Sequence, residues 1–236
     1  MTEEIFRADA YEKQCEARVT VVDAAGIHLD RTVFYPMGGG QPGDTGILQL
    51  QDGSEIRIND TRKDAASGDI VHVPEGDIGA DLVGQQVQAC IDWERRHRLM
   101  RMHTLMHLLC AVIPAGVTGG SVRDGSGRLD FDLPESTLDK EHISAELNRL
   151  VEENHPVSAR WITDDELAAN PELVRTMSVT PPAGTGKVRV LEVQGVDLQP
   201  CGGTHVAATG EIGRVRVRKI EKKGKHNRRV NLEFVD

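Results

Sequence analysis

Residues 92–113 read DWERRHRLMRMHTLMHLLCAVI, and this stretch separates two different sequence patterns. Within it, apolar residues recur at the three- and four-residue spacing of a helix with one buried stripe. The stripe consists of Leu99, Met102, Leu105, Met106, Leu109 and Val112. Pro114 and Gly116 follow and end the helix. We therefore expect a domain boundary near Asp92, with one domain in residues 1–91 and a second in residues 92–236.

The residues before this boundary predict short strands joined by glycine-containing turns. ARVTVVDAAGIHLDRTVF (17–34) reads as a strand, a turn at Ala25 and Gly26, and a second strand. Further strands are predicted at GILQL (46–50), EIRINDTR (55–62) and DIVHVP (69–74). Regular short strands of this kind favour a small β-barrel as the first domain.

A glycine-rich loop, FYPMGGGQPGDTG (34–46), interrupts these strands. It does not match the nucleotide phosphate-binding loop, because that motif needs Lys and then Ser or Thr after its last glycine. A flexible connection is one interpretation of this composition. A loop with a defined shape is the other, and the combination of five glycines with two prolines favours it.

The residues after the boundary mix helices with strands. GGSVRDGSGRLDFDLP (119–134) predicts a hairpin, and residues 138–157 predict a second helix. Thr163 is a candidate N-cap for a short helix in residues 164–174. The remaining predicted strands lie at VSARWIT (157–163), at KVRVLEVQGVDLQP (187–200) and on either side of a basic loop at 222–227. The predicted fold class is α+β: an N-terminal β-barrel followed by an α/β domain with an antiparallel sheet.

Two pairs of metal-ligand residues stand nearly a hundred residues apart. His103 and His107 lie one helical turn apart, so both imidazoles can point to one position. Cys201 and His205 lie in CGGTH, where two glycines allow a tight turn. The four side chains are the nitrogen and sulfur ligands that tetrahedral zinc prefers. Each pair alone could occur by chance, and a purely structural zinc remains an alternative.

The composition excludes several classes of protein. The four cysteines have no framework spacing, so a secreted disulfide scaffold is not expected. The N-terminus lacks the apolar run of a signal peptide, and no stretch is long and apolar enough to span a bilayer. We expect a soluble cytoplasmic protein without a membrane partner.

Charge is distributed unevenly along the chain. The formal net charge is −9, yet residues 214–229 contain nine basic residues and one acidic residue. A basic segment on an acidic chain is typical of a phosphate-binding face and predicts contact with nucleic acid. The alternative is a strand edge protected by solvated lysine and arginine.

Four motifs together resemble the editing domain of alanyl-tRNA synthetase. They are RMHTLMHLL (101–109), GSVRDGSGRLDFDLP (120–134), CGGTHVAATGEIG (201–213) and KGKHNRRVNLEFV (223–235). The glycine-rich loop ahead of them resembles that of the free-standing alanyl-tRNA editing proteins of AlaX type, in their medium-length form. This resemblance covers essentially the whole chain. It implies a small β-barrel followed by an editing domain of the kind also found in threonyl-tRNA synthetase.

The resemblance also implies an activity, namely zinc-dependent hydrolysis of the ester that joins a wrong amino acid to alanine tRNA. Serine is the chief wrong amino acid, and glycine is a further candidate. One zinc ion per chain would be held by His103, His107, Cys201 and His205. The sequence leaves open whether this zinc activates water or only positions the substrate. A trans-acting editor that works as a monomer on the acceptor end of alanine tRNA is the resulting expectation.

The resemblance assigns further roles to individual residues. Thr32 would meet the serine hydroxyl and act in catalysis beside His103 and His107, although a β-branched strand residue is an equal alternative. Substrate binding is expected from Gly38, Gly39, Gly40, Gln41, Ser121, Lys222, Lys223 and Lys225. One departure concerns residues 118–121, which read TGGS where the synthetase domain commonly has Gln-Lys-Gly-Ser. This departure puts the role of Ser121 in doubt.

Two other functions fit parts of the pattern. A zinc-stapled RNA-binding module without catalysis would use the same ligands and the same basic segment. A metalloprotease is weakened because the helix reads His-Thr-Leu-Met-His and lacks the glutamate of His-Glu-x-x-His.

Overall fold

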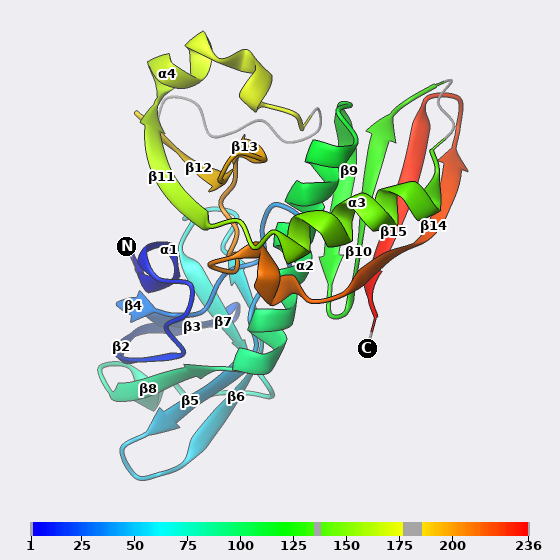
Figure 1. Cartoon of the computed structure of the whole chain (residues 1–236). Coiled ribbons are helices and arrows are strands. Elements are labelled where there is room, and N and C mark those ends of the chain that lie inside the picture. The colour runs from blue at the N-terminus through cyan, green and yellow to red at the C-terminus, as the bar shows by residue number, and fades with distance from the viewer. Residues whose placement is uncertain (1, 135–137, 177–185, 236) are drawn as a thin grey trace. The chain divides into compact units, whose positions relative to one another are not determined.

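The computed structural model describes residues 2–134, 138–176 and 186–235. The chain divides into two compact units, Met1–His97 and Arg98–Asp236. The first unit is a closed antiparallel barrel, and the second combines helices with two antiparallel sheets (Figure 1). The α+β fold class with an N-terminal barrel is therefore confirmed.

Six antiparallel strands close the barrel in the order β2-β3-β7-β6-β5-β8. Their bounds are β2 (Gln14–Asp23), β3 (Gly26–Leu29), β5 (Gly46–Leu50), β6 (Glu55–Lys63), β7 (Ile70–Pro74) and β8 (Gln86–Ile91). Apolar residues alternate into the interior, where Val19, Ile27, Leu48 and Ala89 have almost no exposed surface. This alternation is clearest in β2 and β6, whereas β3 and the first half of β7 are buried on both faces.

Several short elements of the first unit have no such signal. They are β1 (Glu3–Glu4), α1 (Ile5–Ala8), β4 (Arg31–Thr32) and the 3₁₀ turn η1 (Ala80–Leu82). The β1 and β4 strands form a parallel pair of two residues each, which is too short to show a period in the sequence.

In its described residues, the second unit contains two sheets and three α-helices. A four-stranded sheet has the order β14-β15-β10-β9, and a three-stranded sheet has the order β11-β12-β13. The strands are β9 (Val117–Arg123), β10 (Ser126–Asp132), β11 (Val157–Thr163), β12 (Lys187–Val193), β13 (Asp197–Pro200), β14 (Val215–Lys223) and β15 (Asn227–Phe234). The helices are α2 (Trp93–Val112), which begins in the first unit, α3 (Lys140–Glu152) and α4 (Asp164–Ala169), with 3₁₀ turns η2 (Pro171–Leu173) and η3 (Thr209–Ile212).

Helix α2 differs from the single buried stripe expected from its sequence. Every residue from Leu99 to Cys110 is buried except Arg101, which is half-buried. On one side, Met102 and Met106 lie against Gly120 and Gly127 of the four-stranded sheet, where a Cβ atom would be too close. The adjacent side, about 100° further round the helix, carries His103 and His107, and His107 contacts Asp197 of β13. Because both sides are covered, the helix is buried all round, and the predicted stripe describes only part of it.

The start of α2 belongs to the barrel unit. Arg96 is fully buried and forms an ion pair with the buried Asp44, while it also donates to the carbonyl of Val33 at 2.6 Å. The indole of Trp93 stacks on His97, and both rings contact Tyr11. The compact units consequently divide between His97 and Arg98, within the helix, whereas the sequence pattern changes at residues 91 and 92.

The basic segment is more regular than expected. The predicted loop at 222–227 is a turn of three residues, 224–226, because β14 continues to Lys223 and β15 begins at Asn227. Gly224 adopts a φ of 78° and makes this tight turn possible. The basic residues therefore lie on two strands of a hairpin at the edge of the four-stranded sheet (Figure 1).

Candidate metal centre

Four side chains from two distant parts of the second unit converge on one position. His103 and His107 come from α2, and Cys201 and His205 come from the turn that follows β13. One ligand atom from each residue lies within 4.8 Å of the others. The Cys201 Sγ is 3.6 Å from His103 Nε2 and 3.2 Å from His205 Nε2. The four predicted ligands are thus brought together.

Two of the histidines are fixed through their other ring nitrogen. Asp197 Oδ2 lies 2.9 Å from His107 Nδ1, and Thr104 Oγ1 lies 3.1 Å from His205 Nδ1. Because Nδ1 is occupied in both rings, Nε2 is the nitrogen left to face the cluster. A ligating histidine usually has such an outer partner, which sets its tautomer and its orientation. This arrangement is compatible with a metal site.

The carboxylate of Asp197 is itself held in place. Its side chain has no exposed surface, and Gln199 Nε2 donates to both carboxylate oxygens at 2.9 and 2.8 Å. The Arg175 guanidinium lies 3.7 Å from Oδ1. A buried carboxylate with this many partners is pre-oriented toward His107.

The turn that carries Cys201 is supported from β12. Cys201 donates its backbone N–H to the carbonyl of Arg189 at 3.0 Å, which extends the β12–β13 ladder by one residue. The Arg189 guanidinium donates to the carbonyls of Cys201 and Gly203 at 2.8 and 3.0 Å. The Gly203 N–H points at the sulfur at 3.5 Å. Cys201 is half-buried while the three histidines are buried, so Cys201 is the most exposed residue of the cluster.

The protonation states follow from burial and from these contacts. Burial alone would raise the pKa of Cys201, but the neighbouring imidazoles of His103 and His205 hold it well below its usual range. Burial lowers the pKa of His205 to about 3. Burial would lower the pKa of His107 too, but its bonds to Asp197 and Cys201 raise that pKa to about 10. Thiolate and neutral imidazole are the forms that bind metal, whereas His107 must release a proton on binding.

The donor set fits zinc. Bond lengths of about 2.0 to 2.3 Å in a tetrahedral site imply ligand–ligand separations of about 3.3 to 3.8 Å. The two sulfur–nitrogen distances of 3.2 and 3.6 Å are close to this range. Three imidazoles and one thiolate suit zinc better than magnesium or calcium, which prefer oxygen ligands.

Within the barrel unit, Thr32 is fully buried. Its hydroxyl lies 2.8 Å from His72 Nε2 and accepts the Phe34 N–H at 3.0 Å. His72 Nδ1 lies 3.0 Å from the Ile27 carbonyl, which can only accept, so Nδ1 carries the proton. Burial lowers the pKa of His72 to about 4, so the ring is neutral and Nε2 must accept the Thr32 proton. The Thr32 oxygen is therefore available only as an acceptor.

The glycine-rich loop has a defined shape. Gly38 and Gln41 bond to each other across a turn in which Gly39 and Gly40 have φ values of 56° and 82°. Gln41 is fully buried, whereas Met37, which precedes the turn, is 54% exposed. Gly43 approaches Thr61 so closely that a Cβ atom would lie 2.0 Å from the Thr61 carbonyl oxygen. The glycines thus serve the conformation of the loop and its close approach to β6.

The remaining predicted site residues are not brought to the cluster. Ser121 pairs with Arg128, and it alternates with Gly120, whose position for a Cβ atom faces α2. Ser121 therefore points to the sheet face away from α2. Lys222 and Lys223 end β14, and Lys225 lies in the following turn. Lys223 is 3.5 Å from Glu221, whereas Lys222 and Lys225 form no ion pair in the part of the chain that the structure describes.

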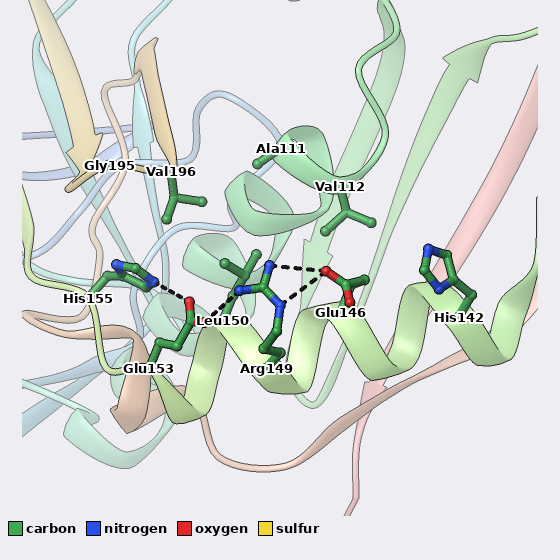
Figure 2. Close-up of a pocket in the computed structure, with 10 residues that line it drawn as sticks. All are labelled: Ala111, Val112, His142, Glu146, Arg149, Leu150, Glu153, His155, Gly195 and Val196. Carbon is green, nitrogen blue, oxygen red and sulfur yellow. Dashed lines mark hydrogen bonds and ion pairs between the residues drawn. The ribbon is translucent and has the colours of Figure 1, made fainter.

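A surface pocket beside α3 is separate from these residues (Figure 2). Its charged side chains contact one another, because Arg149 pairs with Glu146 and Glu153, and His155 Nε2 lies 2.8 Å from Glu153. None of the predicted ligand or substrate residues lines it.

Sequence patterns alone did not identify the supporting residues Thr104, Asp197, Gln199 and Arg189. Asp197, Gln199 and Cys201 alternate along one extended segment, so their side chains share a face. That alternation is a usable signal, although it gains meaning only once Cys201 is known to be a ligand.

Two family matches show the class of protein to which this chain is related. Residues 188–231, which contain the CGGTH turn, match the family described as the threonyl and alanyl tRNA synthetase second additional domain. Residues 2–95, which form the barrel, match the family described as tRNA synthetases class II (A). The fold and the metal-ligand cluster thus belong to a tRNA synthetase-related chain.

Individual relatives are more specific. The alanyl-tRNA editing protein AlaX-M of Methanosarcina mazei is 37% identical, over 100% of this chain and 98% of its own. The AlaX-M protein of Saccharolobus solfataricus is 33% identical over 98% of both chains. The alanine–tRNA ligase of Pyrobaculum neutrophilum is 36% identical over 94% of this chain, which corresponds to 25% of the ligase. The chain belongs to the AlaX-M family of alanyl-tRNA editing proteins.

In the described residues, no helix is long and apolar enough to cross a membrane.

Proposed function

We propose that this protein is a zinc-dependent aminoacyl-tRNA deacylase that corrects mischarged alanine tRNA in trans. The substrate would be alanine tRNA esterified with serine, and glycine is a further candidate. The observation that carries the proposal is the buried cluster of His103, His107, Cys201 and His205 in a chain of the alanyl-tRNA editing family. An aminoacyl ester is already activated, so positioning and charge stabilisation suffice for its hydrolysis.

The chain's own residues would prepare this site. Asp197 holds His107 and Thr104 holds His205, each with Nε2 directed to the cluster. Arg189 fixes the backbone on both sides of Gly202 through the carbonyls of Cys201 and Gly203. A bound zinc ion would supply Lewis acidity for orienting the substrate or polarising a water molecule. The half-buried Cys201 side is the approach for the ester.

Selection against alanine would depend on the serine hydroxyl. A pocket that hydrogen-bonds this hydroxyl leaves a polar group unpaired when alanine is bound. Thr32 is our candidate, because its oxygen can accept the serine proton while its own proton stays on His72. Since Thr32 has no exposed surface, this contact requires local movement of the neighbouring loop at 34–46.

Alanine tRNA is the proposed macromolecular partner, bound by a monomer at its acceptor end. Lys222 and Lys225 at the hairpin tip can contact phosphates without breaking an internal ion pair. Lys223 would first have to leave Glu221. Gly38, Gly39 and Gly40, with Gln41, stay proposed as residues that shape the substrate-binding loop.

The test is to incubate the zinc-loaded protein with serine-charged alanine tRNA and to follow release of serine. Alanine-charged tRNA should be spared. His103→Ala and Cys201→Ala should lose both zinc and activity, whereas His142→Ala, which removes an exposed histidine from α3, should keep both. A protein that binds the tRNA and never releases serine would instead be a zinc-stapled RNA-binding module.

A further inference from the structure

Trp161 is one of two tryptophans in the chain, and 54% of its surface is exposed. It lies on β11, which is an edge strand of the three-stranded sheet. A large aromatic side chain buries much apolar surface when it is covered, so an exposed tryptophan is a candidate contact for a ligand.

Strand register connects Trp161 to the metal-ligand cluster. Trp161 is the cross-strand partner of Arg189 on β12. The backbone carbonyl of Arg189 in turn accepts the N–H of Cys201. This bond continues the register in which Val190 pairs with Pro200. Residues in one cross-strand row point to the same face of a sheet. Trp161, Arg189 and the ligand Cys201 therefore form one row, and two strand spacings, about 10 Å, separate its ends.

The shared face is the one that carries the metal site. Asp197 and Gln199 precede Cys201 with alternating spacing, and Asp197 contacts His107 of α2. The opposite face holds Ile162, Val188 and Val190, which pack with Leu167 of α4. Because Trp161 and Ile162 are sequence neighbours on a strand, Trp161 points away from α4 and to the metal side.

Resting on the function proposed above, we propose that Trp161 is the stacking platform for the terminal adenine of the tRNA acceptor end. Unpaired bases of RNA are commonly bound by stacking on exposed aromatic side chains. The aminoacyl ester and the terminal adenine belong to one nucleotide, which can bridge about 10 Å from the cluster to the indole. The positively charged Arg189 stands between them in the row, where it complements the phosphate charge of the substrate.

A binding experiment tests the subsite without using catalysis. In Trp93→Phe protein loaded with zinc, Trp161 is the only source of tryptophan fluorescence. The trinucleotide cytidylyl-cytidylyl-adenosine should quench this fluorescence to saturation. Trp161→Phe protein, which reports from Trp93 in the barrel unit, should show no saturable quenching. Absence of saturable quenching in the Trp93→Phe protein would overturn the proposal, even if the protein proves to be an active deacylase.

A kinetic experiment asks whether stacking serves the reaction. Trp161→Ala should lower kcat/KM for seryl-adenosine by about 5- to 100-fold, and Trp161→Phe should restore most of it. The seryl ester of 1-deoxyribose, which has no base, should be hydrolysed equally by all three proteins. An equal loss on both esters at unchanged zinc content would mean that Trp161 supports the fold of the site instead. A parent protein that is dimeric by light scattering and becomes monomeric in Trp161→Ala would assign the exposed edge to self-association and also overturn the proposal.

Discussion

Asp197 offers the sharpest test of how the metal centre is built, because one substitution changes its chemistry while keeping its shape. Asp197→Asn replaces one carboxylate oxygen by an amide NH₂. In the parent, one oxygen accepts from His107 Nδ1, and both accept from Gln199. The new NH₂ group must face either the His107 N–H or the Gln199 amide, and both are donors there. Either His107 changes its tautomer or the Gln199 amide turns over.

The expected magnitude follows from the outer-sphere role of this carboxylate. Loss of such a partner typically weakens metal binding 10- to 100-fold, or about 1.4 to 2.7 kcal/mol. The Asp197 side chain has no exposed surface, so water cannot replace the lost acceptor, and we expect the upper half of that range. Asp124→Asn is a matched control, because it removes an equal charge from an exposed pair with Arg98.

The assay is competition for zinc against a chromophoric chelator, with the cobalt-substituted proteins compared by absorption spectroscopy. Asp197→Asn should release zinc at a lower chelator concentration than the parent and the Asp124→Asn control. Its cobalt spectrum should still contain the thiolate charge-transfer band, because Cys201 is untouched. Equal zinc affinities in all three proteins would show that Asp197 does not position His107, and our account of the centre would then be wrong.

Three other perturbations probe the remaining features. Thr32→Val should slow hydrolysis of serine-charged tRNA about ten- to a hundred-fold and leave hydrolysis of alanine-charged tRNA unchanged. The measurement is the ratio of the two deacylation efficiencies in the variant and in the parent. An unaltered ratio with intact zinc would make Thr32 an ordinary strand residue. Charge reversal at Lys222 and Lys225 should weaken tRNA binding and flatten its dependence on salt, while a short seryl-adenosine ester is hydrolysed as before. His72 has a pKa of about 4 in the folded barrel against about 6.5 when unfolded, so the unfolded chain binds more protons between these values. The free energy of unfolding should therefore fall by about 3 kcal/mol as the pH drops from 7 to 4, and His72→Asn should lack this share of the loss in urea titrations.

The elements with a clear sequence period were predictable nearly to the residue. The capping box of Thr163 with Glu166 starts α4 where the sequence suggested an N-cap. Ile143, Leu147, Leu150 and Val151 form the buried side of α3, as their spacing indicates. In both cases the deciding interactions lie within one or two helical turns, so local sequence contains them.

Features that depend on distant partners were not predictable. Arg96 looks like an exposed basic residue in a run of charges, yet the ion pair with Asp44 buries it completely. Ser121 looked like a candidate for substrate binding, and strand register turns it to the sheet face away from α2. The sequence alone does not show whether a charged residue is buried or to which face of a sheet a strand residue points. Both depend on the elements that pack against the residue.

The sequence by itself determined the four candidate metal ligands, because their chemistry and local spacing lie within two short motifs. It also determined the family, through motifs that span the chain. Only the tertiary structure decided that Asp197 and Thr104 orient the histidines, and that Trp161 shares a row with Cys201. The physical reason is that these hydrogen bonds and strand pairings join residues that are distant in the sequence, such as His107 and Asp197. Only folding brings such residues into contact.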